Sequence, residues 1–138
     1  KYGHKVSSNV VTIMQEDIKP ILHESGLIEF PIFFEDGTHL YNKLAFKLDS
    51  YIKRFFSPGI KVINFHPMNF VINPSTIEFM RSIKDTLSRK FYNNFSDEDI
   101  LKYKNDNIGI RNLCIEIIKF SKKYKVVKLS ELYDLAIN

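Results

Sequence analysis

The sequence is poor in the residue types that most readily indicate a function. Cys114 is its only cysteine, so no disulfide can form within the chain and no cysteine cluster can bind a metal. Because Cys114 lies in the apolar run Leu113-Cys114-Ile115, we expect a small buried side chain there. The five glycines are scattered, and neither a Gly-rich phosphate loop nor a G-x-S-x-G elbow occurs. No nucleotide-binding loop and no covalent nucleophile is therefore evident.

Signals for metal binding and for membranes are also missing. The four histidines are His4, His23, His39 and His66. No two of them lie within four residues of each other, so a helix cannot carry a metal-binding histidine pair. A metal site within the chain would need ligands that are distant in sequence to converge. No signal peptide and no membrane span is visible, which leaves the compartment open between the cytoplasm and the cell envelope.

The composition is that of one folded domain over residues 1–138. Its hydrophobic content of 44% is sufficient for a core, and the net charge of +4 is mildly basic. The densest basic cluster is Lys119, Lys122, Lys123, Lys125 and Lys128. It is typical of a solvated helix face, although a basic balance also favours an anionic partner. No zinc-finger spacing and no RNP-type motif accompanies it, so we expect no nucleic-acid partner.

Hydrophobic periodicity predicts an α/β fold with mostly parallel short strands and flanking helices. The apolar runs predict strands at 27–34, 61–66 and 126–127, with Pro31 at an edge or a bulge and an acidic turn at Glu35-Asp36-Gly37. Residues 5–11 could form a short strand or an extended loop. Helical spacing predicts helices at 44–56, 97–103 and 110–124, and a helix entered at 73–75 whose apolar face runs from Ile77 to Phe91. Ser96 and Ser130 are predicted to cap helices, the second being a short last helix at 131–136. Alternation of this kind favours parallel βαβ units.

The candidate site lies where the strand at 61–66 ends on His66 and is stopped by Pro67. Ligands bind at the carboxyl ends of parallel strands, and histidine changes its charge near neutral pH. Asp36 ends the preceding apolar strand, so parallel strands would bring the two side chains to the same rim. His66 could instead bond to backbone at a strand end, and Asp36 could be a turn residue before Gly37. Asn64 and Asn69 could bind a polar substrate, or each could satisfy a loop.

These residues resemble a known family. The run 60–67, followed by Asn69 and Asn73-Pro74, is similar to the C-terminal part of polysaccharide deacetylases, the NodB-homology group of carbohydrate esterases. The stretch 26–37 resembles an earlier strand of that family, and residues 109–132 resemble its final helix and strand. The resemblance implies that residues 1–138 are the C-terminal portion of a larger (β/α) barrel.

The resemblance also implies residue roles. His66 matches the catalytic histidine that assists departure of the amine, and Asp36 matches the acidic position of the preceding motif. Asn64 stands where the family usually has leucine. A divalent metal of the zinc type is implied, but its Asp and His-x-x-x-His ligands and the family's Asp-Asp base do not occur here. Activity as a C–N hydrolase is therefore left open for this chain alone.

Two functions follow as expectations. In the first, the chain is part of an enzyme that hydrolyses N-acetyl groups on a surface carbohydrate. In the second, it is a non-catalytic, truncated deacetylase-like domain that acts as a carbohydrate-binding or assembly module. In either case its partners would be a carbohydrate and, for assembly, the missing N-terminal half or another protomer, because exposed sheet edges favour pairing with another chain.

Overall fold

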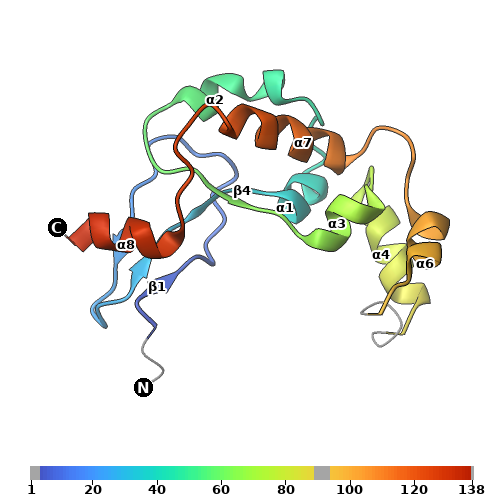
Figure 1. Cartoon of the computed structure of the whole chain (residues 1–138), viewed down its shortest axis with the longest axis horizontal. Helices are drawn as coiled ribbons and strands as arrows, with labels where there is room; N and C mark the ends of the chain where they lie inside the picture. Colours follow the sequence, from blue (N-terminus) through green and yellow to red (C-terminus); the bar gives the residue numbers. More distant parts are fainter. Residues whose placement is uncertain (1–3, 89–93, 138) are drawn as a thin grey trace. The chain divides into compact units, whose positions relative to one another are not determined.

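The computed structural model describes residues 4–88 and 94–137, which form a mixed α/β structure of short strands and helices (Figure 1). The chain divides into two compact units. Unit 1 comprises residues 1–35, 51–64 and 119–138, and unit 2 comprises residues 36–50 and 65–118. Unit 1 holds the strands, and unit 2 is helical.

Unit 1 contains two small sheets. The first has the order β1-β3-β2, in which β3 (Ile28–Glu29) pairs parallel to β1 (Val6–Ser7) and antiparallel to β2 (Ile21–Leu22). The second pairs β4 (Ile32–Glu35) in parallel with β5 (Val62–Asn64), with Glu35 opposite Asn64. Two of these three pairings are parallel, in agreement with the sequence prediction.

The run at 27–34 is not one strand, as predicted, but two strands in different sheets. Pro31 lies between β3 and β4, where its missing N–H cannot interrupt a ladder. Phe30, Phe33 and Phe34 are all buried and form part of the core of unit 1. The apolar run therefore correctly predicts buried strand residues, but it does not predict that Pro31 divides the run into two strands.

A buried carboxylate fixes the chain beside β3. Glu29 accepts hydrogen bonds from the backbone N–H groups of Asn9, at 2.7 Å, and Val10, at 3.1 Å. Burial alone would raise the pKa of Glu29, but the hydrogen bonds from Ser7 and these two amides outweigh it and lower that pKa. Glu29 therefore stays charged in the fold and holds residues 9 and 10 in place.

Unit 2 begins with α1 (Asp36–Tyr41), where the sequence predicted an acidic turn at 35–37. The helix predicted at 44–56 is interrupted: residues 44–47 are irregular, a 3-10 turn covers Leu48–Ser50, and α2 (Ile52–Phe56) follows in unit 1. The Leu48 N–H donates to the Glu116 carboxylate at 2.7 Å rather than to a helical carbonyl. This long-range bond, which no local pattern reveals, accounts for the break.

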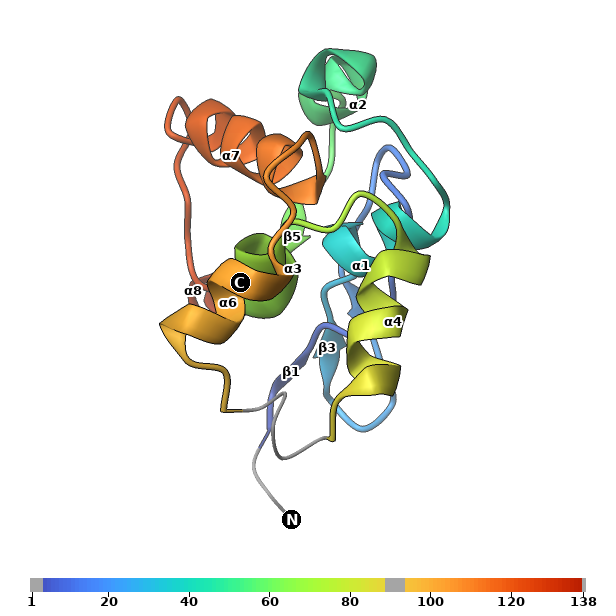
Figure 2. The same ribbon diagram turned by 90° about the vertical axis from the view of Figure 1, so that its right-hand side faces the viewer.

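The remaining helices are α3 (Pro67–Ile72), α4 (Ile77–Thr86), α6 (Asp97–Tyr103), α7 (Ile110–Ser121) and α8 (Leu129–Ile137). Within unit 2, α1 contacts α4 and α3 contacts α6 (Figure 2). The predicted caps differ in outcome. Ser96 caps α6 with a complete capping box, as predicted, whereas α4 is capped by Thr76 and Ser130 lies inside α8. The strand predicted at 126–127 does not form, and Phe91 lies outside the described residues.

The C-terminal end of α3 is held by a buried asparagine. Asn73 has a left-handed backbone, with φ of 56°, and its side-chain NH₂ donates to the carbonyls of Asn105 and Asn107, each at 2.9 Å. Its Oδ1 accepts from the Arg111 N–H at 3.0 Å. Asn73 is 1% exposed, so these bonds satisfy a polar group that burial would otherwise destabilise. They fix the short helix that starts directly after His66.

None of the helices that the structure describes is both long enough and apolar enough to cross a membrane.

Candidate functional site

The parallel pair of β4 and β5 brings two polar side chains together at the carboxyl ends of the strands. Glu35 is opposite Asn64 in the register; Asp36 is the next residue after β4, and His66 lies two residues beyond β5. Parallel neighbours leave a sheet on the same edge, so both chain exits lie at one rim. The sequence prediction that Asp36 and His66 meet is confirmed by their direct hydrogen bonds.

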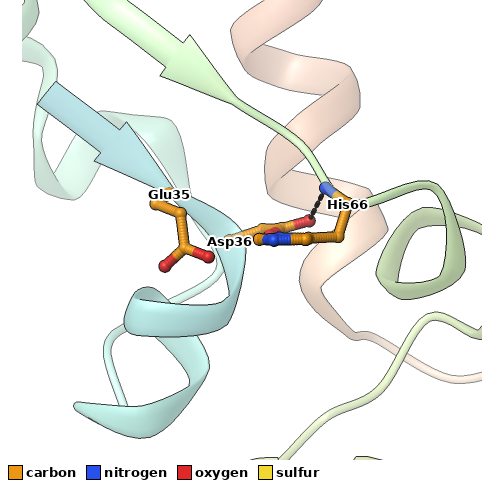
Figure 3. Close-up of side chains that lie close together, drawn as sticks. All are labelled: Glu35, Asp36 and His66. Atoms are coloured by element: carbon orange, nitrogen blue, oxygen red, sulfur yellow. Dashed lines mark hydrogen bonds and ion pairs between the residues drawn. The ribbon is translucent and has the colours of Figure 1, made fainter. Parts of the chain in front are cut away.

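Asp36 binds His66 at two points, and Figure 3 shows the bond to the backbone N–H. Its Oδ2 accepts from the His66 backbone N–H at 2.8 Å, and its Oδ1 lies 2.6 Å from Nδ1 of the His66 ring. The Asp36 side chain is fully buried, whereas the His66 side chain is 51% exposed. The pair therefore consists of a sequestered carboxylate that holds an imidazole reaching solvent.

The backbone at His66 has the geometry that a helix start requires. His66 is the N-cap of α3, with extended φ and ψ of −89° and 121°, and Pro67 occupies the first turn. A residue before proline is restricted to extended geometry, and proline tolerates the first helical position because no donor is needed there. Pro67 thus ends the β5 segment and starts α3, which fixes the direction in which the His66 ring leaves the chain.

The pairing also fixes which ring nitrogen carries hydrogen. An ionised carboxylate only accepts hydrogen bonds, so Nδ1 must donate to Asp36. In the neutral ring the other nitrogen, Nε2, then has a lone pair, and in the protonated ring it has a hydrogen to give. The same logic orients the imidazole of Ser-His-Asp sites. The arrangement suits proton transfer at Nε2.

Two further titratable groups lie near Asp36 in unit 2. Burial lowers the pKa of His39, against the opposing effects of its bond to the Ala45 carbonyl and of the Asp36 charge. Burial also raises the pKa of the Cys114 thiol to about 12, and the Asp36 charge adds to that rise. His39 is thereby favoured as a neutral ring and Cys114 as a neutral thiol. Neither residue therefore adds a charge next to the Asp36 carboxylate.

His39 is the residue that sequence reasoning missed. It is buried, and its Nε2 lies 2.9 Å from the Ala45 carbonyl oxygen. Its position three residues after Asp36 would have indicated proximity if the segment had been recognised as a helix. Instead, the Asp-Gly sequence favoured a turn.

The two asparagines predicted to bind substrate lie in different environments. Asn64 is the last residue of β5 and is half-buried, two residues before His66. Asn69 is buried, at 7% exposure, in α3, where its backbone carbonyl accepts from the Asn73 N–H. Asn64 has the more accessible side chain. A substrate-binding role for either asparagine stays a prediction.

The residues at this rim do not fit a zinc site in their present arrangement. Ligand atoms of Glu35, Asp36 and His66 lie within 4.8 Å of one another, the kind of group that can hold a cation. Both Asp36 oxygens, however, already accept hydrogen bonds from His66, and the 2.6 Å contact leaves no space for an ion between Oδ1 and Nδ1. Tetrahedral zinc takes at least three protein ligands. A zinc ion here would have to break the pair, and we derive no step through one.

A solved structure shares this fold over most of the chain. It is a protein from Bordetella bronchiseptica described as a candidate polysaccharide deacetylase involved in O-antigen biosynthesis. The two chains are 20% identical, with a TM-score of 0.65 over 84% of this chain and 46% of that one. This chain therefore spans about half the length of that protein. No curated protein matches the sequence.

A protein-family model gives the assignment. Residues 1–84 match the model of the WbmS-like polysaccharide deacetylases. The matched stretch is more than half of the 138 residues and contains both Asp36 and His66. The chain belongs to the WbmS-like polysaccharide deacetylase family.

Proposed function

We propose that this chain is the C-terminal portion of a polysaccharide deacetylase that hydrolyses N-acetyl groups on a surface carbohydrate, with His66 as its general acid. The observation that carries the proposal is the Asp36–His66 pair, in which a buried carboxylate orients a half-exposed imidazole. The pair lies within the stretch matched by the family. Family membership supports the carbohydrate substrate, and the Asp36–His66 pair supports acid catalysis.

The step assigned to His66 is the protonation of the leaving nitrogen. Water adds to the acetamide carbonyl carbon to give a tetrahedral intermediate, and the C–N bond then breaks. An amine anion is too basic to leave, so the nitrogen takes a proton as the bond breaks. That proton comes from Nε2 of the protonated His66 ring, and acetate and the free amine are the products. A separate group activates the water.

Asp36 acts through His66 and is a positioning residue. Its two hydrogen bonds hold the backbone and the ring of the same residue, so the ring can rotate little about its side-chain torsions. The carboxylate accepts the Nδ1 hydrogen, so the proton is given or taken at Nε2. Burial of the carboxylate shields this hydrogen bond from competition with water.

We also infer that β4 and β5 are neighbouring strands of a larger parallel (β/α) barrel. Their parallel pairing supports this, as does the match to a longer protein, of which 46% is covered. The partner that completes such a barrel is an N-terminal half or another protomer. Sedimentation of the chain alone tests the second of these partners: self-association is expected if another protomer completes the barrel, and a stable monomer at high concentration would contradict that partner.

Acetate release from an acetylated oligosaccharide tests the catalytic proposal, with the protein in its complete form. His66→Ala should lower kcat by about 10²–10⁴-fold, the usual contribution of a general acid. His23→Ala is the matched control, because His23 is an exposed histidine in unit 1 that no proposed step uses. Undiminished activity in His66→Ala would remove His66 from the mechanism. An unaltered protein that is itself inactive would instead favour the non-catalytic alternative.

A further inference from the structure

The strongest unexplained feature outside the candidate site is a surface of unit 1 built from two segments, 51–64 and 119–128. Together they carry eight of the 20 lysines and arginines, three in the first segment and five in the second, and none of the 16 acidic residues. Like charges at this density repel one another, and an anion relieves that repulsion. The chain as a whole has a net charge of only +4, so this concentration is local.

Aromatic rings bring the two segments side by side. Phe120 packs against Phe55, with ring centroids 5.7 Å apart, against Phe56 at 5.4 Å and against Tyr124 at 5.0 Å. Phe55 in turn meets the fully buried Phe33 at 5.1 Å. The rings form a continuous ladder from the core to the surface, which holds the outer rings rigid.

The outer end of this ladder is open. Phe56 is 64% exposed and Tyr124 is 50% exposed, and a large apolar side chain left in water forgoes the stabilisation of burial. Rigid aromatic rings offer contact area at a low cost in conformational entropy, which is why binding surfaces use them. The ladder therefore ends in a pre-organised platform.

The cations of the two segments are exposed, with one exception. The Lys61 ammonium group donates to the carbonyls of residues 57, 58 and 59 and lies over the Phe33 ring, so it is bound within the fold. The seven that remain are all exposed: Lys53, Arg54, Lys119, Lys122, Lys123, Lys125 and Lys128. We call these seven cations, with Phe56 and Tyr124, the basic aromatic surface.

We propose that the basic aromatic surface binds an anionic polysaccharide, a chain of sugars that carries carboxylates. The C–H faces of a pyranose ring stack on aromatic rings, and the carboxylates pair with the surrounding lysines and arginine. Among polyanions, a polysaccharide is favoured because the chain belongs to a family of polysaccharide deacetylases. The proposal rests on family membership and on this surface, and it does not require His66 to be the catalytic acid.

Binding of oligogalacturonate tests the proposal, with its fully methyl-esterified form as the neutral ligand of the same backbone. The charged oligomer should bind at least about tenfold more tightly, with an affinity that falls as salt rises. Tyr124→Ala and Phe56→Ala should each weaken binding about fivefold or more, as expected for the loss of a stacked ring. Equal binding of the two oligomers, or unchanged binding by both ring variants, would overturn the proposal.

Charge variants give the second arm. Lys122→Gln/Lys123→Gln should weaken binding and reduce the salt dependence by about one unit of slope for each lysine that pairs with a carboxylate. The matched control is Lys43→Gln/Lys102→Gln, which removes the same charge from exposed positions of unit 2, and Tyr41→Ala, also in unit 2, is the matched control for the rings. Controls as weak as the surface variants would overturn the proposal, because net charge alone would then explain binding.

Two further comparisons keep the alternatives apart. A 12-mer of deoxythymidine that binds more tightly than oligogalacturonate would overturn the proposal in favour of a nucleic acid. His66→Ala should bind oligogalacturonate normally. In this variant, oligogalacturonate binding tests the surface proposal, and deacetylation tests the catalytic proposal. The two proposals can therefore fail independently.

Discussion

Replacing Asp36 with asparagine removes the charge from the buried carboxylate while keeping the shape of the side chain. In the wild type both oxygens accept from His66, at 2.8 Å from the backbone N–H and 2.6 Å from Nδ1. Asparagine has one oxygen and one NH₂ group. If its oxygen keeps the backbone bond, the NH₂ faces Nδ1, and two donors cannot meet. The ring must therefore shift its hydrogen from Nδ1 to Nε2.

The magnitude follows from the hydrogen bonds. A bond to a charged group contributes about 1.5–3 kcal/mol and a neutral one about 0.5–1.5 kcal/mol. Two bonds changed from charged to neutral should therefore lower the free energy of unfolding by about 1–3 kcal/mol. The effect on kcat should be larger, about 10²–10⁴-fold, because the imidazolium that donates the proton loses both its acceptor at Nδ1 and its counter-charge.

Three measurements on Asp36→Asn separate these effects: urea unfolding, ¹⁵N chemical shifts of the His66 ring nitrogens, and acetate release. Asp106→Asn is the control, since Asp106 is 75% exposed and its ion pair with Lys104 is at the surface. The control should be within about 0.5 kcal/mol of wild type. A His66 ring that keeps its hydrogen on Nδ1 in Asp36→Asn, with unchanged stability, would refute the reasoning.

Three other predictions concern the surroundings of the pair. Gly109→Ala should lower the free energy of unfolding by about 1–3 kcal/mol, because its Cβ would lie 2.3 Å from the Asn73 carbonyl oxygen; the control Gly26→Ala meets no atom within 4 Å and should show only the strain of a positive φ. Because burial lowers the pKa of His39, the unfolded state binds protons before the folded one, so the free energy of unfolding should fall as pH drops below about 6.5. His39→Gln should flatten that slope in urea titrations, and an unchanged slope would contradict the assignment. Cys114, with a pKa of about 12, should react with iodoacetamide at pH 8 about a thousandfold more slowly in the folded state than in urea, and similar rates would contradict its burial.

The sequence predicted the pairing of Asp36 and His66 because the information is local to two strands. Apolar runs mark β4 and β5, Pro67 marks where the second run stops, and parallel neighbours share an edge. The α6 capping box was also readable, since Ser96 and the acidic residues after it lie within one turn.

What the sequence could not reveal depends on contacts between distant residues. Residues 35–37 have turn chemistry, yet α1 begins at Asp36, whose carboxylate is bonded to His66, 30 positions away. The helix expected at 44–56 is broken where Leu48 donates to Glu116. A β-branched pair at 126–127 has strand propensity, but no described strand pairs with it, and Val126 is 74% exposed. In each case tertiary context overrides a local preference.

The most direct test of the central claim is the dependence of the His66→Ala defect on the leaving group. If His66 gives its proton to the departing nitrogen, the variant should lose about 10²–10⁴-fold in kcat/KM on an N-acetyl substrate. On 4-nitrophenyl acetate, whose leaving group departs as a stable anion, the same variant should lose less than about tenfold. Equal losses on both substrates would contradict the assignment of His66 as the general acid.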